Sequence, residues 1–365
     1  MKKHKVLLIS VLKPVDEPRM YEKMGKSLSK VDHIEVHIAG NSYSKQSRDE
    51  YIRFHPIFSF NRFSIQRIWA PFKIFILLLR LKPSVVIATT HEVLMPAIIY
   101  KLLFWKKLIY DVQENYFKNI RYGSYNSFLK IVLSNYIRLK EYLSHPLINH
   151  YFLAERCYLS EMQWMRSKGT VLENKALPTT TASTGNQELN LIYTGIIGET
   201  YGTLEAIQMA KNILEVAKGT FKIVGYSPDK NYYHKVIMAI ENSPNVSLIG
   251  GNTFVDHDII IEEASKSNLA IISYQNNASI NNKVPTRIFE YLMLKLPMII
   301  PDNPNWIAYC KKYESAITAN FSNPDIESIL HQWKTKSFYA GTSGPEISWH
   351  NEEVKLQDTV VKILI

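Results

Sequence analysis

Two residues of opposite charge stand one helical turn apart in the last third of the chain. Arg287 and Glu290 follow Pro285 and accompany the apolar residues Ile288 and Leu292, a spacing that predicts an amphipathic helix with both charges on one face. A guanidinium can hold phosphate oxygens through paired N–H groups, and a carboxylate can accept two hydroxyl donors at once. On composition alone, a surface ion pair is the favoured interpretation.

A glycine-rich segment, residues 193–202, follows a predicted strand and includes Gly195 and Gly198. Such a loop lets backbone N–H groups approach phosphates at a helix N-terminus. Many α/β proteins have a similar loop for tight packing alone, and the segment leaves both interpretations open. Gly225 ends the next predicted strand.

In the first half of the chain, polar residues also follow apolar runs. His91 comes after one such run, and Gln113 and Glu114 come after another. A carboxylate or an imidazole at a strand end can orient the hydroxyl groups of a ligand. The alternative is that the acidic residues and Thr90 cap the helices that follow.

The elements that must position these residues alternate between short β-rich runs and longer helical patterns, which is typical of βαβ units. The predicted strands are 5–11, 34–39, 85–90, 107–112, 150–153 and 170–172, then 189–194, 221–225, 246–249, 269–273, 298–300 and 316–318. Small polar residues at 177–186 predict a linker between the two series. We therefore expect two doubly wound α/β domains, with ligands at the carboxyl ends of the strands.

Composition limits the function further. With 365 residues, 46% of them hydrophobic, the chain can form two domains with their own cores. Its two cysteines, Cys157 and Cys310, have no Cys or His at metal-ligand spacing, which argues against a zinc module or a disulfide scaffold. The apolar runs at 6–10 and 74–79 are too short for a signal peptide or a spanning helix, which needs ~20 residues.

Charge is unevenly distributed along the chain. Through Pro178 there are 28 Lys and Arg against 14 Asp and Glu, whereas the remainder has 15 against 19. The basic first half indicates an anionic partner or a lysine-rich solvated surface, and we leave both open. Residues 51–91 contain no Asp or Glu, and their six basic residues are interleaved with aromatic ones. This mixture suits either contact with an anionic membrane surface or a helix whose apolar face packs on the core.

The segment from Lys283 to Ile300, with its Pro-Thr-Arg-Ile-Phe-Glu-Tyr core, resembles the nucleotide-domain pattern of GT4-type glycosyltransferases. The glycine loop and the strand-end residues His91 and Glu114 resemble landmarks of the same family in the same order. The resemblance implies the GT-B fold, with two doubly wound Rossmann-like domains facing a cleft. Residues 1–180 would bind the acceptor, residues 186–345 would bind the nucleotide sugar, and a helix in 346–365 would return to the first domain.

The same resemblance implies the roles of individual residues. Glu290 would bind the donor ribose, and Arg287 would face the diphosphate and act in catalysis. The remaining donor contacts would come from Lys283, Thr286, Gly195, Gly198 and Gly225. On the acceptor side, His91, Gln113 and Glu114 would line the cleft.

Two positions depart from the family pattern. Asn282 stands where the family has the first carboxylate of its Glu-x7-Glu pair, and Gln113 stands where relatives have a histidine. Basic residues are also missing around the glycine loop, where Ile196, Ile197 and Glu199 stand. Phosphate charge must then be balanced by Arg287, Lys283 and backbone dipoles.

The resulting expectation is a bacterial glycosyltransferase of the EC 2.4 class, located in the cytoplasm or at the inner face of the plasma membrane. It would transfer a sugar, with retention, from a UDP-, GDP- or similar donor to a glycan or lipid-linked acceptor in surface polysaccharide synthesis. It would use no bound cofactor, no metal and no nucleic acid, and residues 51–91 would contact an anionic membrane.

Three alternatives remain. Asp256-His257-Asp258 could hold a metal on a donor diphosphate, although acidic residues are also expected at a helix start. A non-catalytic protein that binds an anion or a membrane would explain the basic half. A phosphorylase or an epimerase could use the same two-domain scaffold.

Overall fold

The computed structural model describes residues 3–42, 49–60, 64–123, 127–178, 188–340 and 345–365. It divides into unit 1, residues 1–174 with 349–365, and unit 2, residues 175–348. Each unit is a parallel sheet with helices on both faces, as the alternating pattern predicted. Most of the predicted linker, 179–186, lies outside the described residues.

Unit 1 contains a seven-stranded parallel sheet in the order β3-β2-β1-β4-β5-β6-β7. The strands are β1 (His4–Pro14), β2 (Ile34–Asn41), β3 (Ile52–Phe58), β4 (Val85–Ala88), β5 (Lys107–Val112), β6 (His150–Leu153) and β7 (Gly169–Val171). Six of them match strands predicted from the sequence. The sequence analysis assigned no strand at β3, an edge strand that contains Pro56 and is buried mainly at its two ends.

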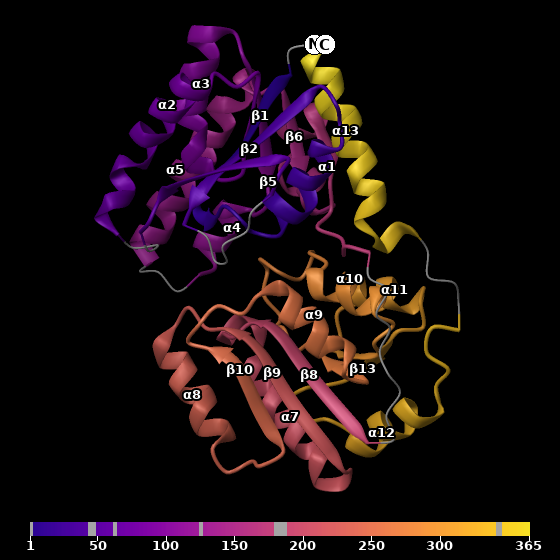
Figure 1. Cartoon of the computed structure of the whole chain (residues 1–365). Coiled ribbons are helices and arrows are strands. Elements are labelled where there is room, and N and C mark those ends of the chain that lie inside the picture. The colour runs from indigo at the N-terminus through magenta and orange to yellow at the C-terminus, as the bar shows by residue number, and fades with distance from the viewer. Residues whose placement is uncertain (1–2, 43–48, 61–63, 124–126, 179–187, 341–344) are drawn as a thin grey trace. The chain divides into compact units, whose positions relative to one another are not determined.

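The helices of unit 1 lie on two sides of this sheet (Figure 1). On one side are α2 (Ala70–Leu81), α3 (Leu94–Phe104) and α5 (Ser127–Ser144). On the other side are the π-helical turn η1 (Arg19–Gly25), α1 (Lys26–Ser29) and α13 (Trp349–Leu364). The shorter helices are η2 (Ile65–Trp69), η3 (His91–Val93), α4 (Tyr116–Arg121), η4 (His145–Leu147), α6 (Tyr158–Glu161) and η5 (Gln163–Lys168).

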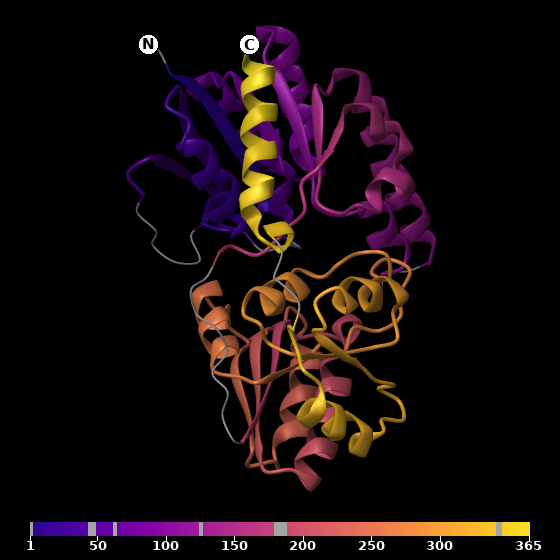
Figure 2. The same cartoon turned by 90° about the vertical axis from the view of Figure 1, so that its right-hand side faces the viewer.

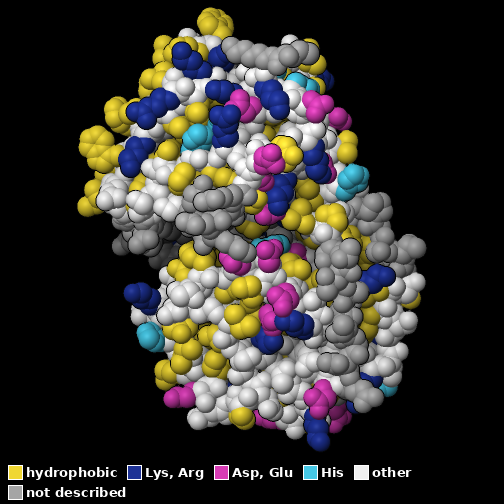
Figure 3. Space-filling view, viewed as in Figure 1, with side chains coloured by type: hydrophobic (Ala, Val, Ile, Leu, Met, Phe, Trp, Pro, Cys, Tyr) yellow, Lys and Arg dark blue, Asp and Glu magenta, His cyan; other side chains and the backbone are white. Residues whose placement is uncertain are grey.

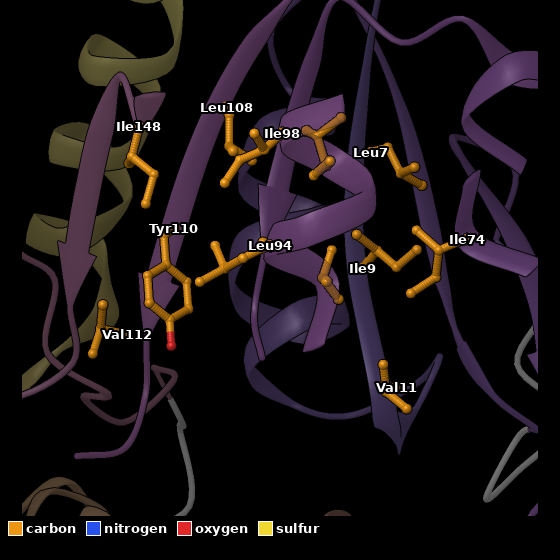
Figure 4. Packing of buried hydrophobic residues seen from close by; sticks show 14 of the residues in the cluster. Leu7, Ile9, Val11, Ile74, Leu94, Ile98, Leu108, Tyr110, Val112 and Ile148 are labelled. Atoms are coloured by element: carbon orange, nitrogen blue, oxygen red, sulfur yellow. The ribbon is translucent and has the colours of Figure 1, made fainter. Parts of the chain in front are cut away.

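The core of unit 1 lies between the sheet and helices α2 and α3 (Figure 4). Alternate residues of β1, Leu7 and Ile9, point toward Ile74 of α2 and Leu94 of α3. The apolar residues at every second position of β1 therefore pack against the apolar faces of α2 and α3.

Helix α13 packs along the opposite face of the same sheet (Figure 2). Leu356 and Val360 are fully buried, and the Trp349 indole donates a hydrogen bond to Ser27 Oγ at 2.9 Å. The buried Glu352 carboxylate accepts a hydrogen bond from the backbone N–H of Glu173. The last helix of the chain is thus an integral part of unit 1.

Unit 2 contains a six-stranded parallel sheet in the order β10-β9-β8-β11-β12-β13. The strands are β8 (Leu189–Ile196), β9 (Gly219–Tyr226), β10 (Val246–Gly251), β11 (Leu269–Ile271), β12 (Met298–Ile300) and β13 (Ala316–Thr318). One face is covered by α7 (Thr203–Val216), α8 (Lys230–Ile240) and α12 (Ile326–Thr335). The other is covered by α9 (His257–Ser265), α10 (Thr286–Met293) and α11 (Pro304–Lys311), and the turns η6 (Glu199–Tyr201) and η7 (Pro345–Ile347) complete the unit.

The strand order of unit 2 reverses between β8 and β11, so consecutive connections leave in opposite directions from this point. A crevice at the carboxyl ends of the strands is expected at such a switch point, and it is where open α/β sheets bind ligands. Among the described residues, no helix combines the length and the apolar character needed to cross a bilayer.

Candidate functional site

Helix α10 holds Arg287 and Glu290 at the switch point of unit 2. Its core-facing residues, including Ile288 and Leu292, are buried against β11 and β12, which fixes the helix and leaves the two charged side chains on the remaining face. Arg287 Nη1 donates to Glu290 Oε2, and Arg287 Nε donates to the backbone carbonyl of Thr194 at the end of β8, 3.2 Å away. The one-turn spacing therefore forms the ion pair that the sequence predicted.

The pair is shielded from solvent. The Glu290 side chain is only 4% exposed and that of Arg287 is 18% exposed. Burial acts to lower the pKa of Arg287, but the combined attraction of Glu290, Tyr274 and Tyr291 with the Glu290 hydrogen bond outweighs it, so the pKa is raised and the guanidinium stays cationic. This arrangement differs from the surface ion pair that composition alone favoured.

A third residue, His257, completes the cluster, and the sequence analysis assigned it no role here. His257 begins α9, and its Nε2 lies 2.8 Å from Glu290 Oε1. Each carboxylate oxygen of Glu290 thus has one basic partner. His257 lies 33 positions before Glu290, and only the packing of α9 beside α10 brings them together.

The glycines of this site have different roles. Gly195 has φ of +116°, and a Cβ there would lie 2.9 Å from Arg287 Nε and 3.0 Å from Nη2. The guanidinium therefore lies directly against the bare backbone of Gly195. Gly225 is needed for strand packing, because its Cβ would lie 1.7 Å from the carbonyl oxygen of Gly195.

Gly198 has an extended backbone that any residue adopts, and a Cβ there would make ordinary contact with Tyr201. Its N–H donates to Thr203 Oγ1 at 3.0 Å. Gly202, in contrast, has φ of +65° and is the N-cap residue of α7, with a Cβ position blocked by the carbonyl oxygen of Ser273. The loop therefore requires glycine at 195 and 202 more strictly than at 198.

A cavity of about 340 Å³ adjoins the Glu290 carboxylate. Residues of α9 and α10 line it together with the end of the chain segment that enters unit 2: Ala176, Leu177, Pro178, His257, Asp258, Ile261, Glu262, Ser265, Glu290, Met293 and Leu294. Its volume lies in the range of small-molecule sites. Within the described residues, no group of three or more His, Cys, Asp or Glu side chains has the geometry of a metal site.

Lys283 and Thr286 lie at the N-terminal end of the same helix. Thr286 is the first residue of α10, and the backbone carbonyl of Lys283 accepts a 2.6 Å hydrogen bond from the Trp306 indole. Asn282 is exposed and lines a second cavity of about 260 Å³ rich in asparagine, between the loops that follow β11 and β12.

The predicted acceptor residues of unit 1 form two separate groups. His91 Nδ1 accepts a hydrogen bond from Lys140 Nζ at 2.7 Å, and its ring meets Tyr116 edge-on at 4.7 Å. Burial lowers the pKa of His91 to about 4, against the opposing attraction of Glu92, so the ring is neutral at pH 7. Glu92 itself pairs with Arg67.

Gln113 belongs to a different group. Its amide nitrogen donates to Asp111 at 2.7 Å and its oxygen accepts from Lys13. Asp111 is fully buried and receives two hydrogen bonds from Arg19. Glu114 accepts a hydrogen bond from Asn119, and it lies close enough to Tyr116, the neighbour of His91, to add to the rise in that tyrosine's pKa that burial causes. Lys13 and Lys140, which the sequence analysis did not single out, are therefore the cations nearest to the predicted acceptor residues Gln113 and His91.

The sequence matches no protein-family model, and no curated protein is detectably similar to it in sequence. Solved structures resemble it closely in fold. Sucrose-phosphate synthase from Thermosynechococcus elongatus superposes with a TM-score of 0.72 at 10% identity, covering 99% of both chains. Anabaena HepE in complex with UDP and glucose gives 0.68 at 10% identity over 99% of both chains. The catalytic domain of starch synthase IV from Arabidopsis thaliana, bound to ADP and acarbose, gives 0.68 at 11% identity over 100% of both chains. With its two parallel-sheet Rossmann-like domains, the chain has the GT-B fold expected from the sequence.

Proposed function

We propose that this protein is a glycosyltransferase that transfers a sugar from a nucleoside diphosphate donor to a hydroxyl group of an acceptor. The observation that carries the proposal is the buried cluster of Arg287, Glu290 and His257 at the switch point of unit 2. Structural neighbours bound to UDP with glucose, or to ADP, support the same class of donor.

Arg287 is the residue that holds the donor diphosphate. Two of its guanidinium nitrogens bind Thr194 O and Glu290, and the third, Nη2, lies over the backbone of Gly195. Because Gly195 has no side chain, the guanidinium can take this position, and its remaining N–H groups are the ones that bind the phosphate. The N-terminus of α10 adds a favourable dipole at the same place.

Glu290 is the residue that binds the ribose. Its two oxygens contact His257 and Arg287 beside the cavity, and a carboxylate, which offers about four lone-pair sites, suits the binding of hydroxyl groups. The neighbouring cavity of about 340 Å³ has room for the nucleoside. The remaining donor contacts come from Lys283, Thr286 and the amides around Gly198.

In the transfer step, the bond between the sugar and the diphosphate breaks and negative charge grows on the leaving phosphate. Arg287 and the α10 N-terminus stabilise that charge. We assign the reaction to the retaining, metal-independent GT4 type, in which the leaving phosphate takes the proton of the acceptor hydroxyl. His91, Gln113 and Glu114 orient the acceptor, with His91 acting as a neutral hydrogen-bonding group.

The acceptor we propose is a glycan or a lipid-linked sugar in bacterial surface polysaccharide synthesis. Residues 51–91 bring the enzyme to the anionic inner face of the plasma membrane. Of their described basic residues, Arg53, Lys73, Arg80 and Lys82 are exposed, with Arg53 paired to Glu35, and Trp69 and Phe72 are exposed as well. These side chains suit a lipid headgroup region.

A thermal-shift panel of UDP, GDP, ADP and dTDP tests the donor class. A nucleotide at ~100 times its Kd stabilises the fold by about 2.7 kcal/mol. Calorimetry with the best nucleotide then compares Glu290→Gln with Glu327→Gln, an exposed carboxylate at the start of α12. We expect weaker binding only in the first variant. Absence of stabilisation by every nucleotide would refute the proposal.

A further inference from the structure

Helix α5 directs mainly polar side chains toward the protein interior and apolar side chains toward the surface. Its inner stripe is buried and mostly polar, comprising Ser134, Ile137, Glu141 and Ser144. Its outer face is apolar and exposed, comprising Phe128, Leu129, Ile131, Val132, Tyr136, Leu139, Tyr142 and Leu143. An amphipathic helix of a protein surrounded by water shows the opposite arrangement.

Helix α3 ends in four consecutive exposed apolar residues, Leu102 to Trp105. Trp105 is 91% exposed and ends the helix in a left-handed conformation, and Lys106 and Lys107 follow it. Met95 and Ile99, at helical spacing on the preceding turns, are also exposed. The tip of α3 thus carries large apolar side chains and lysines side by side.

Helices α2, α3 and α5 cover the same face of the unit 1 sheet (Figure 1). With η2, helix α2 adds the exposed residues Ile65, Ile68, Trp69, Phe72 and Leu79. Figure 3 shows hydrophobic side chains gathered at the edge of unit 1 where α2 and α3 lie, with Lys and Arg among them. We call the exposed apolar residues of η2, α2, α3 and α5 the apolar helix face. Many large exposed apolar side chains on one side of a sheet mark a binding surface.

The charges on these elements identify the partner. Residues 64–82, 94–107 and 127–144 contain a single carboxylate, Glu141, which is buried. Ten basic residues lie in the same ranges: Arg67, Lys73, Arg80, Lys82, Lys101, Lys106, Lys107, Lys130, Arg138 and Lys140. Outside these ranges, Glu92 is paired with Arg67, and Glu161 lies close enough to attract Arg138. The surface therefore suits a partner with an apolar interior and negatively charged groups on its outer surface.

We propose that the apolar helix face docks into the headgroup and acyl boundary of an anionic lipid bilayer, with the tip of α3 inserted. Tryptophan and tyrosine favour this boundary, and each basic residue near anionic lipid strengthens binding roughly fivefold. This surface extends the membrane contact proposed for residues 51–91 to two further helices, and it does not depend on the transfer reaction.

Sedimentation of the full chain with vesicles of phosphatidylglycerol and phosphatidylcholine tests this surface. We expect Leu103→Glu with Leu139→Glu to weaken the partition into vesicles at least tenfold. The matched control is Val354→Glu, which changes an exposed residue of α13 on the opposite side of the sheet and should stay within twofold of the native protein. Binding by the double variant at the native level, or no binding by the native chain, overturns the proposal.

A second measurement locates the inserted tip. Lipids brominated on the acyl chains should quench part of the native tryptophan fluorescence, and Trp105→Phe should remove the share of that quenching that comes from the tip of α3, leaving that of Trp69, while vesicle binding persists. Analytical ultracentrifugation separates this surface from a protein interface, because self-association that Leu103→Glu abolishes would assign the face to a second copy and overturn the lipid assignment. An unchanged nucleotide thermal shift in the variants verifies that unit 2 remains folded and keeps this outcome separate from the donor proposal.

Discussion

Adding one methyl group at Gly195 should disable the donor site, whereas the same change three residues later should have little effect. Gly195→Ala places a Cβ at φ of +116°, 2.9 Å from Arg287 Nε. Gly198→Ala places one in extended backbone, 3.4 Å from the Tyr201 ring. The two glycines stand in the same loop, so each is the control for the other.

Two costs add at Gly195. A side chain in this unfavoured backbone region costs about 1–3 kcal/mol. Carbon and nitrogen need about 3.5 Å or more to avoid repulsion, so the guanidinium must move away from Thr194 O, which it now reaches at 3.2 Å. Loss of a hydrogen bond from a charged donor costs about 1.5–3 kcal/mol. With partial relaxation, we expect unit 2 to lose about 2–4 kcal/mol.

Urea unfolding and calorimetric titration with the stabilising nucleotide measure both effects. Gly195→Ala should lower the unfolding free energy and weaken nucleotide binding at least tenfold. Gly198→Ala should stay within about 0.5 kcal/mol of the native protein. Native-like nucleotide binding in Gly195→Ala, or equal damage in both variants, would contradict the contact between Arg287 and Gly195 as the basis of the site.

Further predictions address other parts of the chain. Arg287→Ala should lower kcat more than Arg287→Lys in single-turnover assays, because the leaving phosphate needs a cation; equal losses would mean that geometry outweighs charge. Glu290→Ala should raise the donor KM with a smaller effect on kcat, and an unchanged KM would remove its ribose role. Burial raises the pKa of Glu141 to about 7 against the Tyr110 hydrogen bond, so the folded state binds the extra proton and stability should fall as the pH rises from about 4.5 through 7. Urea unfolding should show a fall of about 3 kcal/mol that Glu141→Gln lacks, and a parallel profile in that variant would contradict the assignment. Truncation before Ile347 removes α13 and exposes the apolar surface of unit 1 that α13 covers, so the midpoint of urea unfolding should fall to a lower urea concentration. An unchanged midpoint together with unchanged activity would contradict the role of α13 in the fold.

Local pattern was sufficient to predict most of the architecture. All twelve predicted strands overlap a strand by more than half of their length, because parallel strands buried on both faces appear as short apolar runs. Two of them, 85–90 and 269–273, continue two residues beyond β4 and β11, where the chain is still buried but the strand has ended. The strand that was missed, β3, lies at the sheet edge, where Arg53 and Pro56 are tolerated.

The candidate site was less accessible from sequence. The pair Arg287 and Glu290 follows from helical spacing, because one element carries both residues. His257 reaches Glu290 from another helix, and Lys140 reaches His91 across 49 positions, so neither contact leaves a local pattern. Likewise, the outer face of α5 could not be recognised, since a periodic apolar stripe does not say which side faces the core.

The membership of α13 in unit 1 has a consequence for synthesis on the ribosome. Residues 175–348 are made after most of unit 1 and before α13. At about 5–20 residues per second, this interval lasts roughly 10–30 s. During it, the surface that later covers Leu356 and Val360 stays open on the nascent chain. A chaperone that binds apolar surface would have its longest opportunity on this protein before the final helix emerges.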